Sequence, residues 1–325
     1  MTQIPLAALD LVRDELKMVE EMMHSRLAQA FPPVAQALNG LLFRGGKRLR
    51  PAITLLAAKF HPCDIRQILP VATAAETLHT ATLIHDDVID GALLRRGQPT
   101  LNASWSHGAT VLAGDYLFAH SADFAAESGN LRVIRLFSRT LMIICDGELR
   151  QLFSTFDWRQ PKEEYYRRIF AKTASLFQTA AEAGAILSNA PEEHVQALST
   201  YGYSFGMAFQ IVDDILDFIG DEAVMGKPAG SDLRQGTLTL PVFYFLQNDP
   251  RAPELRRLVE EARVNGRGSV EKAVELIRSS DAIEAARAEA QQFITQAKNA
   301  LAVLPSVPAR DALVSLADFV LERHW

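Results

Sequence analysis

The chain has 325 residues, of which 48% are hydrophobic and 22% charged, a composition typical of a folded globular protein and too apolar for a disordered one. Its formal net charge of −6 excludes the broad basic surface that nucleic-acid binding requires, so a polyanionic ligand would have to meet local clusters of Lys and Arg. The two cysteines, Cys63 and Cys145, do not make a disulfide framework.

The N-terminal stretch MTQIPLAALDLVRDELKMVEE is charged and amphipathic, and it lacks the uninterrupted apolar core of a signal peptide. No apolar run approaches the roughly 20 residues that span a bilayer, which predicts no integral membrane segment. These features favour a cytoplasmic protein and leave transient contact with a membrane open.

Apolar residues recur at intervals of three and four along most of the chain, which predicts α-helices. In chain order the predicted helices cover 6–29, 51–60, 66–89, 108–127, 131–153, 162–189, 193–218, 252–263, 270–279, 282–303 and 309–323. The two-residue alternation of strands is scarce. We therefore predict one all-α domain over residues 1–325, a bundle of long helices around a central substrate cavity.

Two long loops, at 91–104 and 220–236, each follow the end of a predicted helix that is rich in aspartate. Loops of this length in a compact domain are usually functional or disordered. Because both follow the same kind of helix end, we expect them to be functional.

Those helix ends read LIHDDVID at 83–90 and IVDDILDF at 211–218, with three aspartates at the same spacing among apolar residues. The clusters consist of Asp86, Asp87 and Asp90, and of Asp213, Asp214 and Asp217. On a helix the first and third aspartates lie one turn apart on one face. Such carboxylates suit a hard divalent cation, and Mg²⁺ fits best because it shares itself between carboxylates, waters and substrate phosphates. A solvated acidic face is the plainer alternative, but carboxylates among aliphatic neighbours argue against it.

Polar residues precede both clusters at helical spacing. His79 lies two turns before Asp86 and Thr82 one turn before it, and Gln210 holds a comparable place before the second cluster. The two helices are therefore expected to turn polar stripes toward a shared cavity.

Basic residues complete the pattern. GGKRLRP at 45–51 places Lys47, Arg48 and Arg50 at a helix start, where free backbone N–H groups favour phosphate. Further basic residues are Arg95 and Arg96 after the first cluster, Lys172 in IFAKTASLF, and Lys227 in the second loop. The combination predicts a substrate with a diphosphate head, held by magnesium, and an apolar tail in a helical tunnel.

With these motifs the chain resembles the all-trans isoprenyl diphosphate synthases, or polyprenyl synthetases, over almost its full length. The resemblance lies in GGKRLRP, ETLHTATLIHDDVID, RRGQPT, GD at 114–115, DGELRQ at 146–151, AKTASLF and GMAFQIVDDILDF followed by GDEAVMGKPAGSDLRQG. It implies an all-helical, Mg²⁺-dependent homodimer that joins isopentenyl diphosphate to an allylic diphosphate (farnesyl, geranylgeranyl or shorter).

The resemblance also implies roles for single residues. The metal ligands would be Asp86, Asp87, Asp90 and Asp213, with Asp214 and Asp217. The allylic diphosphate would meet Arg95, Lys172 and Lys227, and the isopentenyl diphosphate would meet Lys47, Arg50, His79 and Arg96. Thr173 and Gln210 would line the region between the two substrates, and Arg323 is a candidate cover for the isopentenyl site. Thr237 stands where many relatives carry a lysine, so one diphosphate contact is in doubt.

In this family the residues about one turn before the first cluster govern product length. Here they are Ala81 and Thr82, both small, which predicts a long product of hepta- to decaprenyl size with its stop deeper in the cavity.

Other interpretations stay open: a short-chain farnesyl or geranylgeranyl synthase, a non-catalytic subunit of a heteromeric synthase, a terpene cyclase, and a histidine–aspartate phosphohydrolase prompted by His85–Asp86. The cyclase fits poorly with two carboxylate triplets, and for the phosphohydrolase His107 and His120 do not complete a convincing set of histidine ligands.

Overall fold

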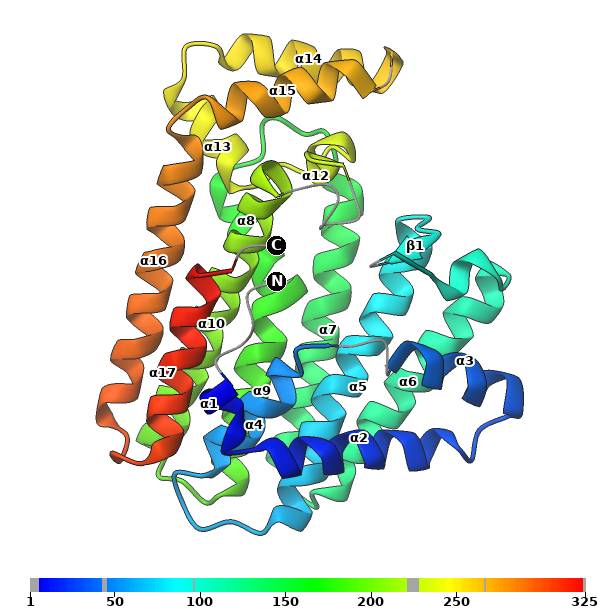
Figure 1. Ribbon diagram of the computed structural model, residues 1–325, viewed down its shortest axis with the longest axis vertical. Coiled ribbons are helices and arrows are strands. Elements are labelled where there is room, and N and C mark those ends of the chain that lie inside the picture. Colours follow the sequence, from blue (N-terminus) through cyan, green and yellow to red (C-terminus); the bar gives the residue numbers. More distant parts are fainter. Residues whose placement is uncertain (1–5, 43–45, 96, 221–227, 266, 324–325) are drawn as a thin grey trace.

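The computed structural model describes residues 6–42, 46–95, 97–220, 228–265 and 267–323, and these residues are predominantly helical (Figure 1). The α-helices are α1 Leu6–Asp10, α2 Arg13–Leu27, α3 Pro32–Leu42, α4 Leu49–Ala58, α5 Ile65–Ile89, α6 His107–Glu127, α7 Leu131–Ser154, α8 Lys162–Ile169, α9 Ser175–Leu187, α10 Glu192–Ile219, α12 Ser231–Arg234, α13 Leu240–Asn248, α14 Ala252–Asn265, α15 Arg267–Arg278, α16 Ala282–Ala300 and α17 Pro308–Leu321. The predicted all-α class is confirmed.

Shorter elements join these helices. A two-stranded antiparallel hairpin, β1 Leu94–Arg95 and β2 Gln98–Pro99, lies in the first long loop. Single turns of 3₁₀ helix occur at η1 Leu101–Ala103 and η3 Leu301–Val303. A π-helical segment, η2 Phe170–Ala174, connects α8 to α9.

The core of the molecule lies among α4, α5, α9 and α10, whose mutual packing Figure 1 shows as a group of roughly aligned helices with α16 and α17 along one side. All ten residues of α4 are buried, which is why its sequence lacks a polar face. Pro70 lies inside α5 without ending it. No described helix combines the length and the apolarity of a membrane-spanning segment.

Two glycines allow the π-helical segment to sit close to its neighbours. A Cβ atom at Gly147 of α7 would lie 2.3 Å from Ala171 Cβ, and one at Gly206 of α10 would lie 2.5 Å from Ala174 Cα. Any larger residue would push the segment away from α7 or α10. Helices α7 and α10 thus fix η2, and with it Lys172 and Thr173, from two sides.

The predicted helices recur with shifted ends, apart from four differences. The predicted helix 6–29 is broken after Asp10 into α1 and α2, and 162–189 contains the π-helical segment. Helices α3 and α13 occupy stretches for which no helix was predicted, and α12 forms a short turn inside the second long loop.

Candidate active site

The two aspartate clusters lie at the C-terminal ends of α5 and α10, at the same end of the bundle (Figure 1). In the first cluster Asp87 is buried, Asp86 is half-buried, and Asp90 is exposed and caps α5. A helix C-terminus carries partial negative charge, so gathering carboxylates there costs free energy unless cations offset it. The site therefore calls for positive charge from the protein or from a ligand.

Protein cations supply only part of that charge in the first cluster. Arg95 Nε donates a hydrogen bond of 2.8 Å to Asp87 Oδ1. Burial nevertheless raises the pKa of both Asp86 and Asp87 above the usual range, although Lys172 and Arg95 oppose it at Asp86 and Arg95 opposes it at Asp87. The cations of the protein thus do not offset the cost of burying these two carboxylates, and a further cation would stabilise their charged forms.

Lys172 interacts with acids of the first cluster and with Asp232, a neighbour of the second. Its Nζ is 4.0 Å from Glu148 Oε1, and 36% of its side chain remains accessible. Burial lowers the pKa of Lys172, but the carboxylates of Asp86, Glu148, Asp232 and Asp90 outweigh burial and raise the pKa above its usual range. Asp232 in turn donates its backbone N–H to Asp217 of the second cluster, over 3.1 Å. A cationic lysine therefore faces acids that belong to both sides of the site.

The second cluster is tied to its surroundings at each aspartate. Arg323 Nη2 donates to Asp213 Oδ1 over 2.6 Å. Both oxygens of the buried Asp214 accept hydrogen bonds of 2.8 Å, Oδ2 from Tyr165 and Oδ1 from Gln210. Burial and the nearby Asp232 raise the pKa of Asp214 to about 7, against the hydrogen bonds from Gln210 and Tyr165.

The residues expected between the substrates do lie together. Thr173 Oγ1 donates a 2.6 Å hydrogen bond to Gln210 Oε1, so η2 and α10 are linked next to the second cluster. The wider i→i+5 turn of a π-helix changes which side chains face the neighbouring helix, and such segments are frequent at functional sites.

The clusters fit a hard divalent cation that is also bound by substrate. Their donors are carboxylate oxygens, the ligands that Mg²⁺ and Ca²⁺ take. Within the described ranges no three His, Cys, Asp or Glu side chains are close enough to hold an ion without other ligands. Carboxylate oxygens are compatible with Mg²⁺, which usually keeps several waters and shares its shell with phosphate oxygens.

Arg50 and Arg48, both from GGKRLRP, play different parts. Arg50 is 9% exposed, its guanidinium lies 4.3 Å from the ring centroid of Phe177, and its Nε has no hydrogen-bond partner among the described residues. Burial lowers the pKa of Arg50 to about 10, although Glu76 and Asp213 favour the charged form. An undersatisfied buried guanidinium near Asp213 is a suitable group for binding an anion.

Arg48 instead holds the segment in place. It adopts a left-handed backbone conformation with φ 47°, and it forms ion pairs of 2.7 Å with Glu76 and 3.0 Å with Glu20. Lys47 is half-buried, with its Nζ 4.9 Å from the ring centroid of Phe319 in α17.

The remaining predicted residues are distributed as follows. His79 and Thr82 are half-buried on α5, Thr82 Oγ1 donates to His79 O over 2.7 Å, and Ala81 is fully buried. Arg96 and Lys227 lie outside the described residues, as does the part of the second loop at 221–227. Thr237 donates its backbone N–H to Asp232 O over 2.9 Å.

His85 turns away from the first cluster. Its Nε2 lies 3.1 Å from Val111 O and 3.4 Å from Asp115 Oδ1, both on α6. Since this contact directs His85 to a neighbouring helix, it weakens the interpretation of His85–Asp86 as a phosphohydrolase motif.

Three residues of the site were not singled out from the sequence. Glu148 belongs to the quoted motif DGELRQ and Asp232 to GDEAVMGKPAGSDLRQG, which could have drawn attention to both, whereas Tyr165 carries no comparable signal. Tyr165 becomes visible only through its contact with the second cluster.

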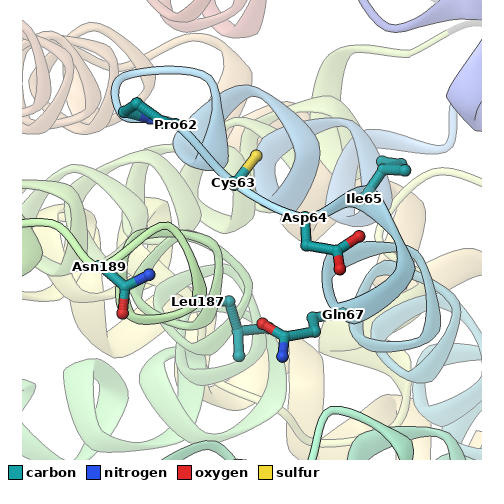
Figure 2. Close-up of a pocket in the computed structure, with 7 residues that line it drawn as sticks. All are labelled: Pro62, Cys63, Asp64, Ile65, Gln67, Leu187 and Asn189. Atoms are coloured by element: carbon teal, nitrogen blue, oxygen red, sulfur yellow. The ribbon is translucent and has the colours of Figure 1, made fainter.

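The surface hollow in Figure 2 lies apart from the two aspartate clusters. It has a volume of about 550 Å³ and lies at the start of α5, where Asp64 caps the helix and binds Arg66. Asp64 is its only carboxylate, and it precedes Asp86 by 22 residues, about 33 Å along a helix. The hollow therefore does not belong to the candidate site.

Comparison with known proteins agrees with the geometry. The family model described as Polyprenyl synthetase matches residues 32–277. The chain belongs to this family. It is 41% identical to heptaprenyl diphosphate synthase component 2 of Geobacillus stearothermophilus over 96% of this chain and 97% of that protein.

Solved structures show the same similarity. A polyprenyl synthase from Caulobacter crescentus, complexed with calcium and isoprenyl diphosphate, is 36% identical, with a TM-score of 0.92 over 98% of both chains. A decaprenyl diphosphate synthase from Rhodobacter capsulatus is 37% identical, with a TM-score of 0.89 over 98% of both chains. The predicted family and enzyme class are confirmed: the chain is a trans-polyprenyl diphosphate synthase, a prenyltransferase.

Proposed function

We propose that the enzyme uses Mg²⁺ to add isopentenyl diphosphate repeatedly to an allylic diphosphate and releases a long product, of hepta- to decaprenyl size. The observation that carries the proposal is the hydrogen-bonded link from Thr173 through Gln210 to Asp214 of the second cluster, next to Lys172, whose positive charge is favoured by Asp86 and Asp90 of the first cluster. A head group with several negative charges, bound through metal, suits such a mixture of acids and a cation.

The binding roles follow from the residues of the two clusters and from the cations around them. Asp86, Asp87, Asp90, Asp213 and Asp217 would hold the metal on the allylic diphosphate. Arg95, Lys172 and Lys227 would contact the same diphosphate, and Lys47, Arg50, His79 and Arg96 would hold that of the isopentenyl substrate. The metal, when bound, neutralises charge on the leaving diphosphate.

In the reaction the allylic C–O bond breaks, and its electron pair leaves with the diphosphate. Lys172 and Arg95 stabilise that leaving group, while the oxygens of Thr173 and Gln210 face the allylic cation. The double bond of isopentenyl diphosphate then forms the new C–C bond, and the released diphosphate takes the proton that is lost. The loop at 91–104 would exclude water, which would otherwise capture the cation.

A long product is supported by small residues before the first cluster. Ala81 and Thr82 leave the face of α5 one turn before Asp86 without a bulky side chain. The similarity to heptaprenyl and decaprenyl synthases points in the same direction.

A homodimer is supported by an apolar surface on the neighbouring helices α6 and α7. Its exposed side chains are Val111, Leu112, Leu131, Met142, Leu149, Leu152 and Phe153, the last with 89% of its surface accessible. Exposed apolar surface of this kind is typical of protein interfaces. We propose that a second copy of the chain covers this surface, and that each chain forms one polyprenyl synthetase domain. The location that we propose is the cytoplasm, where the free Cys63 and Cys145 would stay reduced.

A heteromeric enzyme is the second candidate, because relatives from Geobacillus stearothermophilus and Bacillus subtilis are each named component 2. The purified chain alone decides between the two. Incubated with farnesyl diphosphate, labelled isopentenyl diphosphate and Mg²⁺, it is expected to run as a dimer and make hepta- to decaprenyl products, and chelation should stop turnover. No elongation by the pure chain would favour the heteromer.

The metal roles have a separate test. Asp86→Asn and Asp213→Asn are each expected to lower kcat by about a thousandfold or more while the circular dichroism spectrum stays unchanged. Full turnover in both variants would contradict the proposed site.

A further inference from the structure

Four side chains form a continuous hydrogen-bonded chain from α8 through α10 to η2. Tyr165 Oη donates to Asp214 Oδ2 over 2.8 Å, Gln210 Nε2 donates to Asp214 Oδ1 over 2.8 Å, and Thr173 Oγ1 donates to Gln210 Oε1 over 2.6 Å. Tyr165 is fully buried and Asp214 is 3% exposed, so water does not compete strongly for these bonds. One end of this chain reaches the substrate region, and the other end is in the core.

The chemistry of the groups determines which way round Gln210 lies. Both oxygens of Asp214 accept hydrogen bonds in the structure, so the NH₂ end of the Gln210 amide faces Asp214. The carbonyl oxygen then faces Thr173, whose hydroxyl can donate to it. Without an acceptor at position 214, the amide could turn over and present NH₂ where the carbonyl oxygen now lies.

Each carboxylate oxygen of Asp214 has its own donor. Tyr165 is the donor at Oδ2, and Gln210 is the donor at Oδ1. Asp213 differs, because it is more exposed and its ion-pair partner is the cation Arg323. The two neighbouring aspartates therefore have different surroundings, although the sequence presents them as equivalent.

We propose that Tyr165 and Asp214 are positioning residues: Tyr165 fixes the Asp214 carboxylate, and Asp214 fixes the Gln210 amide with its carbonyl oxygen next to Thr173. This assigns Asp214 to orienting Gln210 rather than to direct metal binding. The inference rests on the proposed function, in which the oxygens of Gln210 and Thr173 face the allylic cation. A carbonyl oxygen stabilises that cation, whereas an NH₂ group in its place would repel it.

The first experiment compares Tyr165→Phe with Tyr166→Phe. The two tyrosines are adjacent on α8, but Tyr166 donates to Glu289 and has no part in the site, so it is a matched control for loss of one hydroxyl. The readouts are kcat, the KM for isopentenyl diphosphate, the ratio of farnesol to elongated product, and binding of Mg²⁺ with inorganic pyrophosphate by calorimetry.

Tyr165→Phe is expected to lower kcat about tenfold with KM changed less than about twofold, because it loosens groups that act on the transition state. The farnesol ratio should rise, since a poorly guided cation is captured by water more often, and binding of Mg²⁺ with pyrophosphate should stay unchanged. Tyr166→Phe should match the wild type in all four. Equal behaviour of the two variants, or loss of pyrophosphate binding in Tyr165→Phe, overturns the inference.

The second experiment reverses the hydrogen bond between positions 214 and 210. Asp214→Asn replaces one acceptor oxygen with an NH₂ donor, and Gln210→Glu sets two carboxyl groups against each other. When both substitutions are combined, the new amide at position 214 can donate to the new carboxylate at position 210, which can still accept from Thr173. We expect the double variant to exceed Asp214→Asn in kcat by about tenfold, a coupling that independent sites do not show.

If Asp214 were a metal ligand, the neutral amide at position 214 would still fail to bind the metal in the double variant. The decreases in kcat caused by the two single substitutions would then multiply. Multiplied losses therefore overturn the inference, and a double variant that does not fold leaves the decision to the tyrosine pair. The proposed function fails separately, because wild-type enzyme that does not elongate farnesyl diphosphate refutes it before any variant is compared.

Discussion

Arg323, the last described residue of the chain, donates from Nη2 to Oδ1 of Asp213, the first aspartate of the second cluster, over 2.6 Å. Arg323 is 3% exposed, and its guanidinium lies 4.1 Å from the ring centroid of Phe209. The C-terminal end of the chain thus places a buried cation on a carboxylate that we assign to metal binding. A metal bound by Asp213 would compete with Arg323 for the same oxygen.

Arg323→Gln is expected to destabilise the ligand-free enzyme by about 2 kcal/mol. The value is moderate because about a third of the Asp213 side chain is accessible to solvent, which weakens the ion pair. Addition of Mg²⁺ with inorganic pyrophosphate should then raise Tm more in the variant than in the wild type, because no ion pair has to be broken first. Differential scanning fluorimetry with and without the ligands measures both effects. An equal ligand-induced rise in the two proteins would show that Arg323 does not compete with metal.

The helix pattern could be predicted well, and three of the exceptions have an identifiable physical cause. Helix α3 begins with Pro32, and α13 begins with Leu240–Pro241. Proline is tolerated in a first turn, because the N–H group that it lacks would have no partner inside the helix. Both stretches resemble loops in sequence because proline usually interrupts a helix. The π-helical segment at Phe170–Ala174 depends on close approach to Gly147 and Gly206, which only the folded structure reveals.

Gly206→Ala should therefore disturb the site as well as the core. The added Cβ would lie 2.5 Å from Ala174 Cα, a backbone contact that cannot be relieved by turning a side chain. We expect a loss of about 1–3 kcal/mol in the free energy of unfolding, and a fall in kcat because η2 carries Lys172 and Thr173.

Gly108→Ala in α6 is the matched control, since nothing lies within 4 Å of its added Cβ. Chemical denaturation and steady-state kinetics on both variants provide the comparison. Wild-type kcat in Gly206→Ala would mean that the position of η2 does not matter for turnover.

The candidate site could be predicted where a motif carried it, and not where contacts alone define it. Asp87 and Arg95 were both predicted, and they are joined by a 2.8 Å hydrogen bond. Tyr165 could not be found, because a tyrosine in an amphipathic helix is usually a residue of the hydrophobic core. Its hydrogen-bond partner Asp214 also lies 49 residues further along the sequence. The division of roles between Arg48 and Arg50 was equally hidden, since both are arginines of one short motif.

Ala81→Phe tests the direction in which the product grows. Ala81 is fully buried on α5, slightly more than one turn before Asp86, so a phenyl ring there should block a chain extending along the helix. We expect shorter products, in the farnesyl to geranylgeranyl range, with binding of Mg²⁺ and pyrophosphate retained. Chromatography of the dephosphorylated products gives the chain length, and Ala81→Val serves as a milder control with a smaller shift. Products of unchanged length in Ala81→Phe would place the growing chain elsewhere.

The pair formed by His61 and His194 should make stability depend on pH. His61 Nε2 lies 2.9 Å from His194 Nδ1, between the loop after α4 and the start of α10. Burial, followed by the neighbouring His194, lowers the pKa of His61 below its usual value of about 6.5. The unfolded chain therefore binds the proton at a higher pH than the folded chain does. Stability is fully present above the unfolded pKa, and it is lost as pH falls through the folded one.

Wild-type Tm should accordingly fall between about pH 7.5 and about pH 5.5, and His61→Gln should show a smaller fall, because glutamine takes up no proton. Other groups also titrate in this interval, so the decisive quantity is the difference between variant and wild type. His107→Gln, an exposed position on α6, controls for the loss of a histidine as such. If His61→Gln and His107→Gln both retain the full wild-type fall, the histidine pair does not contribute to the acid sensitivity of the fold.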